Sequence, residues 1–353
     1  MAGIVPPGAF ARGRSGAVYV LTNQATGNSV MVYRRAPDGI LSYSGTFSTG
    51  GKGMGTGADP LGSQGALTLG PGRRLLFAVN AGSNEISEFA VRGRKLYLLD
   101  KVSSHGVMPV SIAVHGWLVY VLNAGGTPNI KGFIIDPFTN RLISLPGSRR
   151  KLAGGSGAAP AEVGFSRDGS TLAVTEKGTS KIDTYAVNDF GFARALGSNA
   201  SNGTTPFGFA FLHRDFLLVS EAGPNALSSY QVDPNGKLDL ISGSVPNGQT
   251  ATCWVVVTDD GRYAYTASAG TAAISSYSVT RDGILSLIDP AAEVTGNGSA
   301  PTDLALSRDS RFLYVRDGGS DSVSAFRVES NGSLVAIGSV SGIPAGAQGI
   351  AAR

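Results

Sequence analysis

One block of sequence recurs seven times along the 353-residue chain, at intervals of about 50 residues. In each copy a hydrophobic run ends in a short polar residue, a glycine-rich turn follows, and a second run ends in an aromatic residue, as in VNAGSNEISEF and SEAGPNALSSY. The polar residues are Asn23, Asn80, Asn123, Glu176, Glu221, Ser268 and Asp317, and the aromatic residues are Tyr33, Phe89, Phe133, Tyr185, Tyr230, Tyr277 and Phe326. A tandem array of small identical units is therefore expected.

Each unit reads as four short strands joined by tight turns. A turn such as Asp259-Asp260-Gly261 follows the first strand, and another such as Pro37-Asp38-Gly39 precedes the fourth. Short β-rich runs separated by Gly, Asn, Asp and Pro are hairpin signals, and no long amphipathic helix is evident. Seven four-stranded antiparallel units predict an all-β, seven-bladed β-propeller, in which the repeated aromatic residues pack between blades.

The chain ends predict how the ring closes. Residues 347–352 resemble residues 63–68, which open the second repeat, whereas the first repeat lacks its opening strand. The C-terminal strand is therefore expected to join the N-terminal blade and cover its bare edge. We predict an N-terminal extension over residues 1–16 and a single propeller domain over residues 17–353.

Composition limits the partners of such a protein. Charged residues make up 15% of the chain, hydrophobic residues 42%, and the 29 Lys and Arg residues are spread along it. Nucleic-acid binders concentrate positive charge on one face, so no nucleic-acid partner is expected. No apolar run reaches the length of about 18 residues that a membrane helix needs. We expect a monomer that binds a small molecule in the central channel.

Metal and cofactor chemistry have little support in the sequence. The chain contains one cysteine, Cys253, and three histidines, which argues against multi-cysteine or histidine-rich metal centres. No cofactor and no metal site are predicted. The alternative is a Ca²⁺ ion among channel oxygens, since Ca²⁺ prefers carboxylate and carbonyl ligands.

The N-terminal residues contain no apolar core of the kind found in signal peptides. Low charge and abundant Gly, Ser, Thr and Asn nevertheless favour an exported protein. We expect an extracellular or periplasmic protein whose signal peptide is missing from this sequence, with a cytoplasmic protein as the alternative.

Strand order predicts where a site lies. The loops that enter first strands and those that leave second strands share one end of the ring, called here the top face. This places at the top of the channel the second-strand residues Asn80, Asn123, Glu176, Glu221 and Asp317, and the first-strand residues Gln64, Glu162, Asp303 and Gln348. His105 lies in a top-face loop, whereas His115 and His213 lie at the bottom. The glycine-rich segment 50–57 is interpreted as a flexible top-face loop that can act as a lid.

Three glutamates are the predicted catalytic residues. Glu162 and Glu176 belong to one blade and Glu221 to the next, and crowded carboxylates raise one another's pKa, which suits proton transfer at neutral pH. The predicted substrate-binding residues are Gln64, Asn80, Asn123, Asp303, Asp317, Gln348 and His105. The alternative is that these polar groups hydrate the channel or hydrogen-bond the turn amides.

The repeats, above all residues 301–315, resemble the lactonase-type seven-bladed propeller family, which includes bacterial 6-phosphogluconolactonase and fungal carboxymuconate lactonizing enzyme. The resemblance covers residues 17–353. In those enzymes two strand entrances read Pro-His-Gln and Pro-Arg-His, whereas here they read Pro160-Ala161-Glu162 and Pro206-Phe207-Gly208. The resemblance thus matches one acidic residue of those enzymes to Glu221, whereas their histidine and arginine are absent from the matching positions here.

Two functions follow from these observations. The first is a lactonase-like propeller that hydrolyses or forms a lactone of a small neutral or cationic molecule at an acidic top-face funnel. In it Glu221 or Glu176 acts as general base, and Asn80, Asn123 and Gln64 orient the substrate. The second is a non-catalytic binding or scaffold propeller, similar to YVTN-type surface repeats. The grouped glutamates favour the enzyme, and the missing histidine and arginine favour the scaffold.

Overall fold

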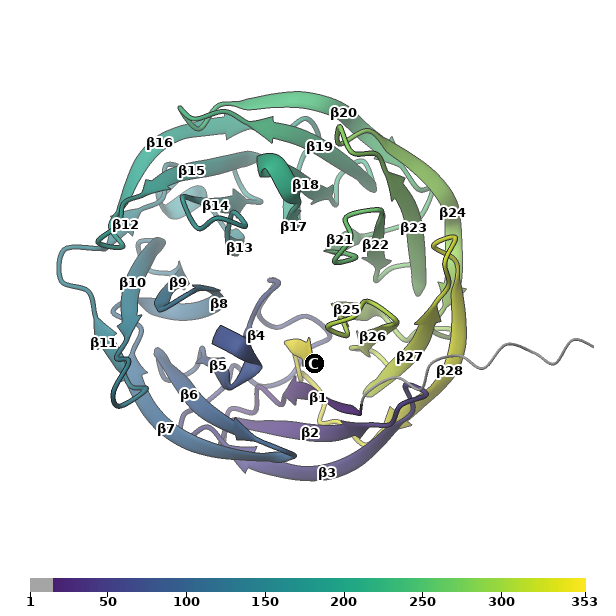
Figure 1. Ribbon diagram of the computed structural model, residues 1–353, viewed down its shortest axis with the longest axis horizontal. Coiled ribbons are helices and arrows are strands. Elements are labelled where there is room, and N and C mark those ends of the chain that lie inside the picture. Colours follow the sequence, from purple (N-terminus) through teal and green to yellow (C-terminus); the bar gives the residue numbers. More distant parts are fainter. Residues whose placement is uncertain (1–14) are drawn as a thin grey trace, which may run out of the picture.

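The computed structural model describes residues 15–353, apart from the side chains of Pro71 and Arg214. Residues 1–14, and with them most of the predicted N-terminal extension, lie outside this part. The described chain forms seven antiparallel sheets arranged in a ring around a central axis (Figure 1). The predicted all-β, seven-bladed propeller is confirmed.

Each blade is named here by its place along the chain and given from its innermost strand outward. The strands of blades 1 to 3 are β29 (Ile350–Ala352), β1 (Gly16–Leu21), β2 (Ser29–Arg35) and β3 (Leu41–Ser48); β4 (Leu67–Leu69), β5 (Leu75–Asn80), β6 (Glu85–Arg92) and β7 (Lys95–Ser103); β8 (Val107–His115), β9 (Leu118–Gly125), β10 (Asn129–Ile135) and β11 (Leu142–Ser144), with β12 (Arg150–Lys151) also on β10. The strands of blades 4 and 5 are β13 (Pro160–Phe165), β14 (Thr171–Glu176), β15 (Lys181–Val187) and β16 (Ala193–Ala200); β17 (Pro206–Phe211), β18 (Phe216–Glu221), β19 (Ala226–Val232) and β20 (Leu238–Pro246). Those of blades 6 and 7 are β21 (Thr252–Val257), β22 (Tyr263–Ser268), β23 (Ala273–Val279) and β24 (Leu285–Val294); β25 (Pro301–Leu306), β26 (Phe312–Asp317), β27 (Ser322–Val328) and β28 (Leu334–Ser341).

The two ends of the chain complete blade 1, as predicted. β29 pairs antiparallel with β1, with Tyr19 opposite Ala351. The backbone N–H of Leu21 donates to Gly349 O at 3.0 Å, and that of Arg353 donates to Ala17 O at 2.9 Å. Without β29, the backbone groups of β1 would be left without these partners at an open sheet edge.

The core lies within and between the blades. Every residue of β5 and β26 is buried, whereas an outer strand such as β16 is largely exposed. The seven repeated aromatic residues of the third strands are all at most 2% exposed, which confirms their predicted role in packing. Apolar burial of this kind supplies most of the stability of a ring without helices.

The glycine turns that precede two of the fourth strands receive a hydroxyl from the preceding blade. Tyr314 in blade 7 donates to the carbonyl of Gly39 in blade 1 at 2.8 Å, and Tyr265 in blade 6 donates to that of Gly332 in blade 7 at 3.0 Å. Both glycines have positive φ, 92° and 84°, which is a conformation that favours glycine. The turn motif of the sequence therefore also connects neighbouring blades.

Blade 3 departs from the four-strand plan. Its outer strand is interrupted between β11 and β12, where Pro146 has no N–H to donate and Gly147 has φ +74°. Ser148 Oγ donates to Gly132 O at 3.2 Å within this gap. The helical segments of the described chain are three 3₁₀ turns, η1 (Pro71–Arg73), η2 (Gly155–Gly157) and η3 (His213–Asp215), and no helix there is long and apolar enough to cross a membrane.

Candidate functional site in the central channel

The polar residues that end the second strands anchor the top-face loops of their own blades. Asn80 Oδ1 accepts a hydrogen bond from Thr49 Oγ1 at 2.7 Å, and Asn123 Nδ2 donates to Ser104 O at 3.3 Å. Thr49 and Ser104 lie in the loops that enter the first strands of the same two blades. Both asparagines are 0% exposed. The repeated position is therefore explained by loop anchoring, which is the alternative stated above.

Glu221 follows the same pattern with a fully occupied carboxylate. It accepts hydrogen bonds from Gly203 N at 2.7 Å, Ser201 Oγ at 3.0 Å, Ser244 Oγ at 2.6 Å and Tyr230 OH at 3.3 Å. Its side chain is 0% exposed. The carboxylate thus holds the loop before β17 against β19 and β20.

Glu176 is buried in a separate network in blade 4. Its Oε1 accepts from Gly154 N at 3.0 Å, and its Oε2 accepts from Thr179 Oγ1. Burial first, and the neighbouring Asp183 second, raise the pKa of Glu176. Asp317 in blade 7 is likewise 0% exposed and accepts from Ser324 Oγ at 2.7 Å, and burial raises its pKa to about 6.

The residues that open the first strands behave differently, because their side chains meet near the axis of the ring. Gln64, Asp303 and Gln348 are 8%, 3% and 0% exposed, and Glu162 is half-buried. Together with Asp59 they are called the channel cluster. Four of its five members were predicted as site residues from their place in the repeat.

A chain segment fills the upper part of the channel. Residues 58–65, called the plug, run from blade 1 to β4 and reach the centre of the ring (Figure 1). Ser63 O accepts from Trp254 Nε1 of blade 6 at 3.0 Å, and Ser63 Oγ donates to Val110 O of blade 3 at 2.8 Å. Gln64 N donates to Ala161 O of blade 4 at 3.2 Å. The plug therefore crosses the channel at the top face, where the acidic funnel was predicted.

The glycine-rich segment before the plug is also held in place. Gly53 N donates to Gln24 O at 2.8 Å, and Gly55 N donates to Asn23 O at 2.9 Å. A Cβ on Gly53 would lie 2.1 Å from the backbone of Asn23. Segment 50–57 is therefore a packed lead into the plug, and the expectation of a flexible loop is corrected by this close packing.

Gln64 connects opposite sides of the ring. Its Oε1 accepts from Val255 N at 3.0 Å and its Nε2 donates to Val255 O at 2.9 Å, so the carboxamide satisfies both backbone groups of one residue in β21. The same Nε2 lies 3.5 Å from Glu162 Oε1. Glu162 Oε2 accepts from Phe209 N at 2.6 Å. Gln64 therefore holds the Glu162 carboxylate from one side and β17 holds it from the other.

Burial controls the electrostatics of the channel cluster. It raises the pKa of Asp303 to about 8 and that of Asp59 to about 6, and it raises the pKa of Glu162 well above the ordinary range. Asp303 adds a smaller repulsion to Glu162, although its own oxygens accept from Leu304 N at 2.8 Å and Ile350 N at 3.3 Å. The cluster therefore contains carboxyl groups that exchange protons near neutral pH.

One cation and one thiol adjoin the cluster. Lys177 Nζ donates to Gly62 O of the plug and lies 4.7 Å from the centre of the Phe207 ring. Cys253 is 8% exposed, and burial raises the pKa of its thiol to about 12. A protonated, buried thiol is a poor nucleophile.

The structure does not gather the three predicted glutamates into one cluster. Glu162 faces the channel, Glu176 interacts with Asp183, and Glu221 is enclosed by loop hydroxyls. The physical reason is that second-strand ends turn outward to the loops, whereas first-strand starts turn inward. His105 is exposed, and its ring lies 5.9 Å from that of Phe133 rather than at the channel.

Below the plug, a cavity of about 280 Å³ occupies the lower part of the channel. Gln64 lines it together with Phe209 of β17 and Val255 of β21. The bottom-face turns add three arginines, Arg73, Arg167 and Arg308. This cavity is called the lower bore. The sequence analysis did not predict these arginines. Their shared position could have indicated them, since each lies just after the first strand of its repeat.

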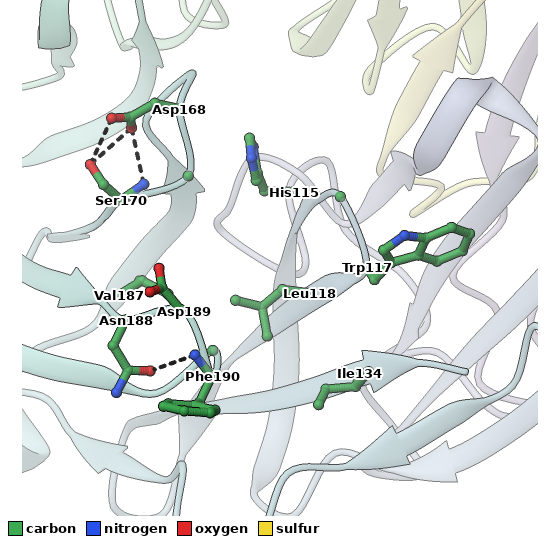
Figure 2. Close-up of a pocket in the computed structure, with 13 residues that line it drawn as sticks. His115, Trp117, Leu118, Ile134, Asp168, Ser170, Val187, Asn188, Asp189 and Phe190 are labelled. Atoms are coloured by element: carbon green, nitrogen blue, oxygen red, sulfur yellow. Dashed lines mark hydrogen bonds between the residues drawn. The ribbon is translucent and has the colours of Figure 1, made fainter. Parts of the chain in front are cut away.

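A second hollow of about 450 Å³ opens on the bottom face between blades 3 and 4 (Figure 2). His115, Asp168 and Asn188 line it, and the bottom position predicted for His115 is confirmed. Figure 2 shows Asp168 bonded to Ser170 and Asn188 bonded to the backbone N–H of Phe190. Because these polar groups stabilise their own turns, we place the candidate site in the channel.

Within residues 15–353 no group of three or more His, Cys, Asp or Glu side chains is placed to hold a metal ion. The channel cluster instead pairs its carboxyl groups with backbone amides and glutamine side chains.

Comparisons with known proteins agree with this fold. The family model "Lactonase, 7-bladed beta-propeller" matches residues 218–345. A crystal structure of a Lactobacillus plantarum protein is similar with a TM-score of 0.78 at 17% identity, over 96% of this chain and 99% of that chain. A candidate 6-phosphogluconolactonase from Bacteroides fragilis gives 0.74 at 16% identity, over 96% and 98%. A periplasmic gluconolactonase from Pseudomonas aeruginosa gives 0.70 at 17% identity, over 95% and 99%.

No curated protein matches the chain. At these identities the solved structures show the fold alone, and fold by itself does not specify a reaction. The lactonase propeller family model thus matches blades 5 to 7, and the solved structures share the seven-bladed propeller fold along nearly the whole chain.

Proposed function

We propose that this chain is an enzyme that hydrolyses or forms a lactone of a small molecule bound in the lower bore, with Glu162 as the proton-transfer group. The observation that carries this proposal is the position of the Glu162 carboxylate. It is half-buried and hydrogen-bonded to Phe209 N at 2.6 Å, with Gln64 Nε2 at 3.5 Å, and both of these residues line the bore.

The proposed hydrolysis uses the raised pKa of Glu162. The ionised Glu162 carboxylate takes a proton from a water molecule while the oxygen of that water bonds to the lactone carbonyl carbon. The tetrahedral intermediate then loses the ring oxygen, which takes the proton from Glu162, so the carboxylate is restored and the hydroxy acid leaves. Because its pKa is raised, the Glu162 carboxylate is a stronger base in the first step than an ordinary glutamate, and it returns the proton in the second. Lactone formation is the same sequence reversed.

The remaining members of the channel cluster have supporting roles in this proposal. Gln64 is a positioning residue, because its carboxamide is bonded to Val255 and adjoins Glu162. The Asp303 carboxyl repels negative charge on Glu162 and so helps to raise the pKa of Glu162. Asn80, Asn123, Glu176, Glu221 and Asp317 are buried loop anchors, and Gln348 is bonded to the plug through Leu61 N at 2.8 Å.

The experiment is a screen of γ- and δ-lactones with a pH-indicator readout, followed by Glu162→Gln. We expect kcat to fall by roughly 10²- to 10⁴-fold, the range for loss of a general acid–base group. Glu221→Gln is the control, because it changes a buried carboxyl of the neighbouring blade that is bonded to loop donors, and it should affect stability more than kcat. Unchanged turnover in Glu162→Gln would remove the assignment.

A non-catalytic binding or scaffold propeller is the second candidate, and the plug favours it. Residues 58–65 cross the channel at the top face, and several predicted site carboxylates accept hydrogen bonds from protein donors. This candidate predicts that no lactone in the screen is turned over while small molecules still bind.

We propose further that the protein acts as an exported monomer on a small-molecule ligand, without nucleic acid. The low share of charged residues, 15%, and the absence of cysteine pairs from the sequence are compatible with this environment. Light scattering during size-exclusion chromatography tests the monomer, for which a mass near 36.1 kDa is expected.

A further inference from the structure

The lower bore is surrounded by arginines from three well-separated blades. Arg73 lies in η1 between β4 and β5, Arg167 in the turn between β13 and β14, and Arg308 in the turn between β25 and β26. All three line the same cavity of about 280 Å³. An adjoining hollow of about 510 Å³ also has Arg73 and Arg308 in its wall. The ring thus brings together cations that lie far apart in the sequence.

The protein itself uses few of the hydrogen-bond donors of these arginines. Arg308 is exposed and makes no hydrogen bond or ion pair with any described residue. Arg73 is half-buried and donates to the carbonyl of Ala352. Arg167 contacts the His213 ring at 2.9 Å and donates to Asp259 O at 3.2 Å. A guanidinium group has five N–H donors, so most of these donors remain available at the bore.

Negative charge near the three arginines does not neutralise them. Asp259 lines the bore, and Asp309 follows Arg308, but none of the three arginines forms an ion pair with any carboxylate in residues 15–353. Ser307 Oγ donates to Asp309 Oδ1 at 2.7 Å, and Arg35 adds a further positive charge near Arg73. Burial, Arg308 and, to a smaller extent, Arg35 lower the pKa of Arg73, whereas the carboxylates of Asp259 and Asp309 raise it, and the net shift is downward. The arrangement therefore carries a like-charge repulsion that an anion would relieve.

We propose that the lower bore binds a small anion bearing a phosphate or two or more carboxylate groups, held by Arg308, Arg73 and Arg167. Planar guanidinium groups match phosphate and carboxylate oxygens with paired hydrogen bonds. A concave site of one sign also concentrates counter-ions at its mouth. This inference goes beyond the proposed reaction, because it concerns binding and requires no turnover. It replaces the expectation of a neutral or cationic ligand, which rested on the missing histidine and arginine of the top face.

Isothermal titration calorimetry at low ionic strength tests the site, with inorganic phosphate and citrate as probes and glucose as the uncharged comparison. The main variant is Arg308→Gln, since its side chain is exposed and its loss should not affect folding. We expect saturable binding of at least one anion, weakened about tenfold to a hundredfold in Arg308→Gln, the range for one charge-assisted partner. Arg73→Gln should weaken binding by a similar factor.

The matched control is Arg94→Gln, an exposed arginine in the turn between β6 and β7 on the outer part of the same face. It should leave the affinity unchanged. Tighter binding of phosphate than citrate assigns the site to phosphate groups, and the reverse assigns it to polycarboxylates. Absence of saturable binding, or equal weakening by Arg94→Gln and Arg308→Gln, would overturn the proposal. Because calorimetry does not depend on turnover, a failed lactone screen leaves this result interpretable.

Discussion

Gln64 and Val255, 191 positions apart, are joined across the centre of the ring by two hydrogen bonds of 3.0 and 2.9 Å. The first residue belongs to the plug that leads into blade 2, and the second lies in the inner strand of blade 6. The propeller is therefore closed twice, once around its circumference by β29 and once across its channel by the plug. The second closure positions Glu162 and separates the lower bore from the top face.

Replacing Gln64 by alanine should weaken this central connection. Val255 would lose partners for its N–H and C=O groups in a buried setting, which costs about 2–4 kcal/mol for two neutral hydrogen bonds. Urea unfolding of Gln64→Ala measures this loss. Gln249→Ala is the control, because the Gln249 carboxamide makes no hydrogen bond in the described part of the chain. Equal stability of the two variants would contradict the role given to Gln64.

Much of the fold was predictable because the repeat is a strong signal. Seven aromatic positions, seven polar strand ends and the match between residues 347–352 and 63–68 specify blade number and closure. The same signal does not separate site residues from loop anchors, since Glu176 and Glu221 both bond to the loops of their blades. The plug and the arginines were harder to predict. Residues 58–65 resemble residues 342–349 in sequence, which gives no sign that they cross the channel, and Arg73, Arg167 and Arg308 meet only when the ring forms.

Asp303 should make stability depend on pH. Its pKa is about 8 in the folded protein and about 4 in an unfolded chain, so the unfolded state loses its proton first. Folding stability therefore falls as pH rises from about 4 to 8. Asp303→Asn removes this contribution and should flatten the curve of unfolding free energy against pH.

The two curves are expected to cross. Below pH 5 the variant should be less stable by about 1 kcal/mol, because an amide nitrogen cannot accept the hydrogen bond from Ile350 N. Above pH 8 it should be the more stable protein. Asp59 and Glu162 titrate in the same channel with Lys177 beside them, so the difference between wild type and variant is the quantity to measure. Asp189→Asn, at an exposed position, should follow the wild type at every pH.

Glu88 is a buried carboxyl outside the candidate site. It is 0% exposed in β6, and neither of its oxygens has a hydrogen-bond partner in residues 15–353. Burial first and Asp100 second raise its pKa to about 8. Glu88→Leu should therefore stabilise the protein by about 1–3 kcal/mol at pH 7, the cost of an unpaired buried polar group.

The gain from Glu88→Leu should increase between pH 7 and 9, as the wild-type carboxyl ionises. Thermal and urea unfolding at both pH values measure it. Glu85→Leu is the control in the same strand, since Glu85 is partly exposed and paired with Lys101. A surface ion pair contributes about 0–1 kcal/mol, so this control should be neutral or slightly destabilised. A destabilised Glu88→Leu would show that the carboxyl has a partner role.

The seam between blades 7 and 1 is where the two chain ends meet, and Tyr314 reaches across it. Its hydroxyl donates to Gly39 O at 2.8 Å from a fully buried ring. Tyr314→Phe removes one neutral hydrogen bond and should lower the unfolding free energy by about 1 kcal/mol.

Tyr265→Phe removes the equivalent bond to Gly332 at the seam between blades 6 and 7, where the chain is continuous. The two variants should therefore lose similar global stability but differ locally. Hydrogen exchange should accelerate in β1 and β29 only for Tyr314→Phe, because β29 is a separate end of the chain that pairs with β1 over only three residues. Equal exchange in both variants would show that the seam opens only with the whole ring.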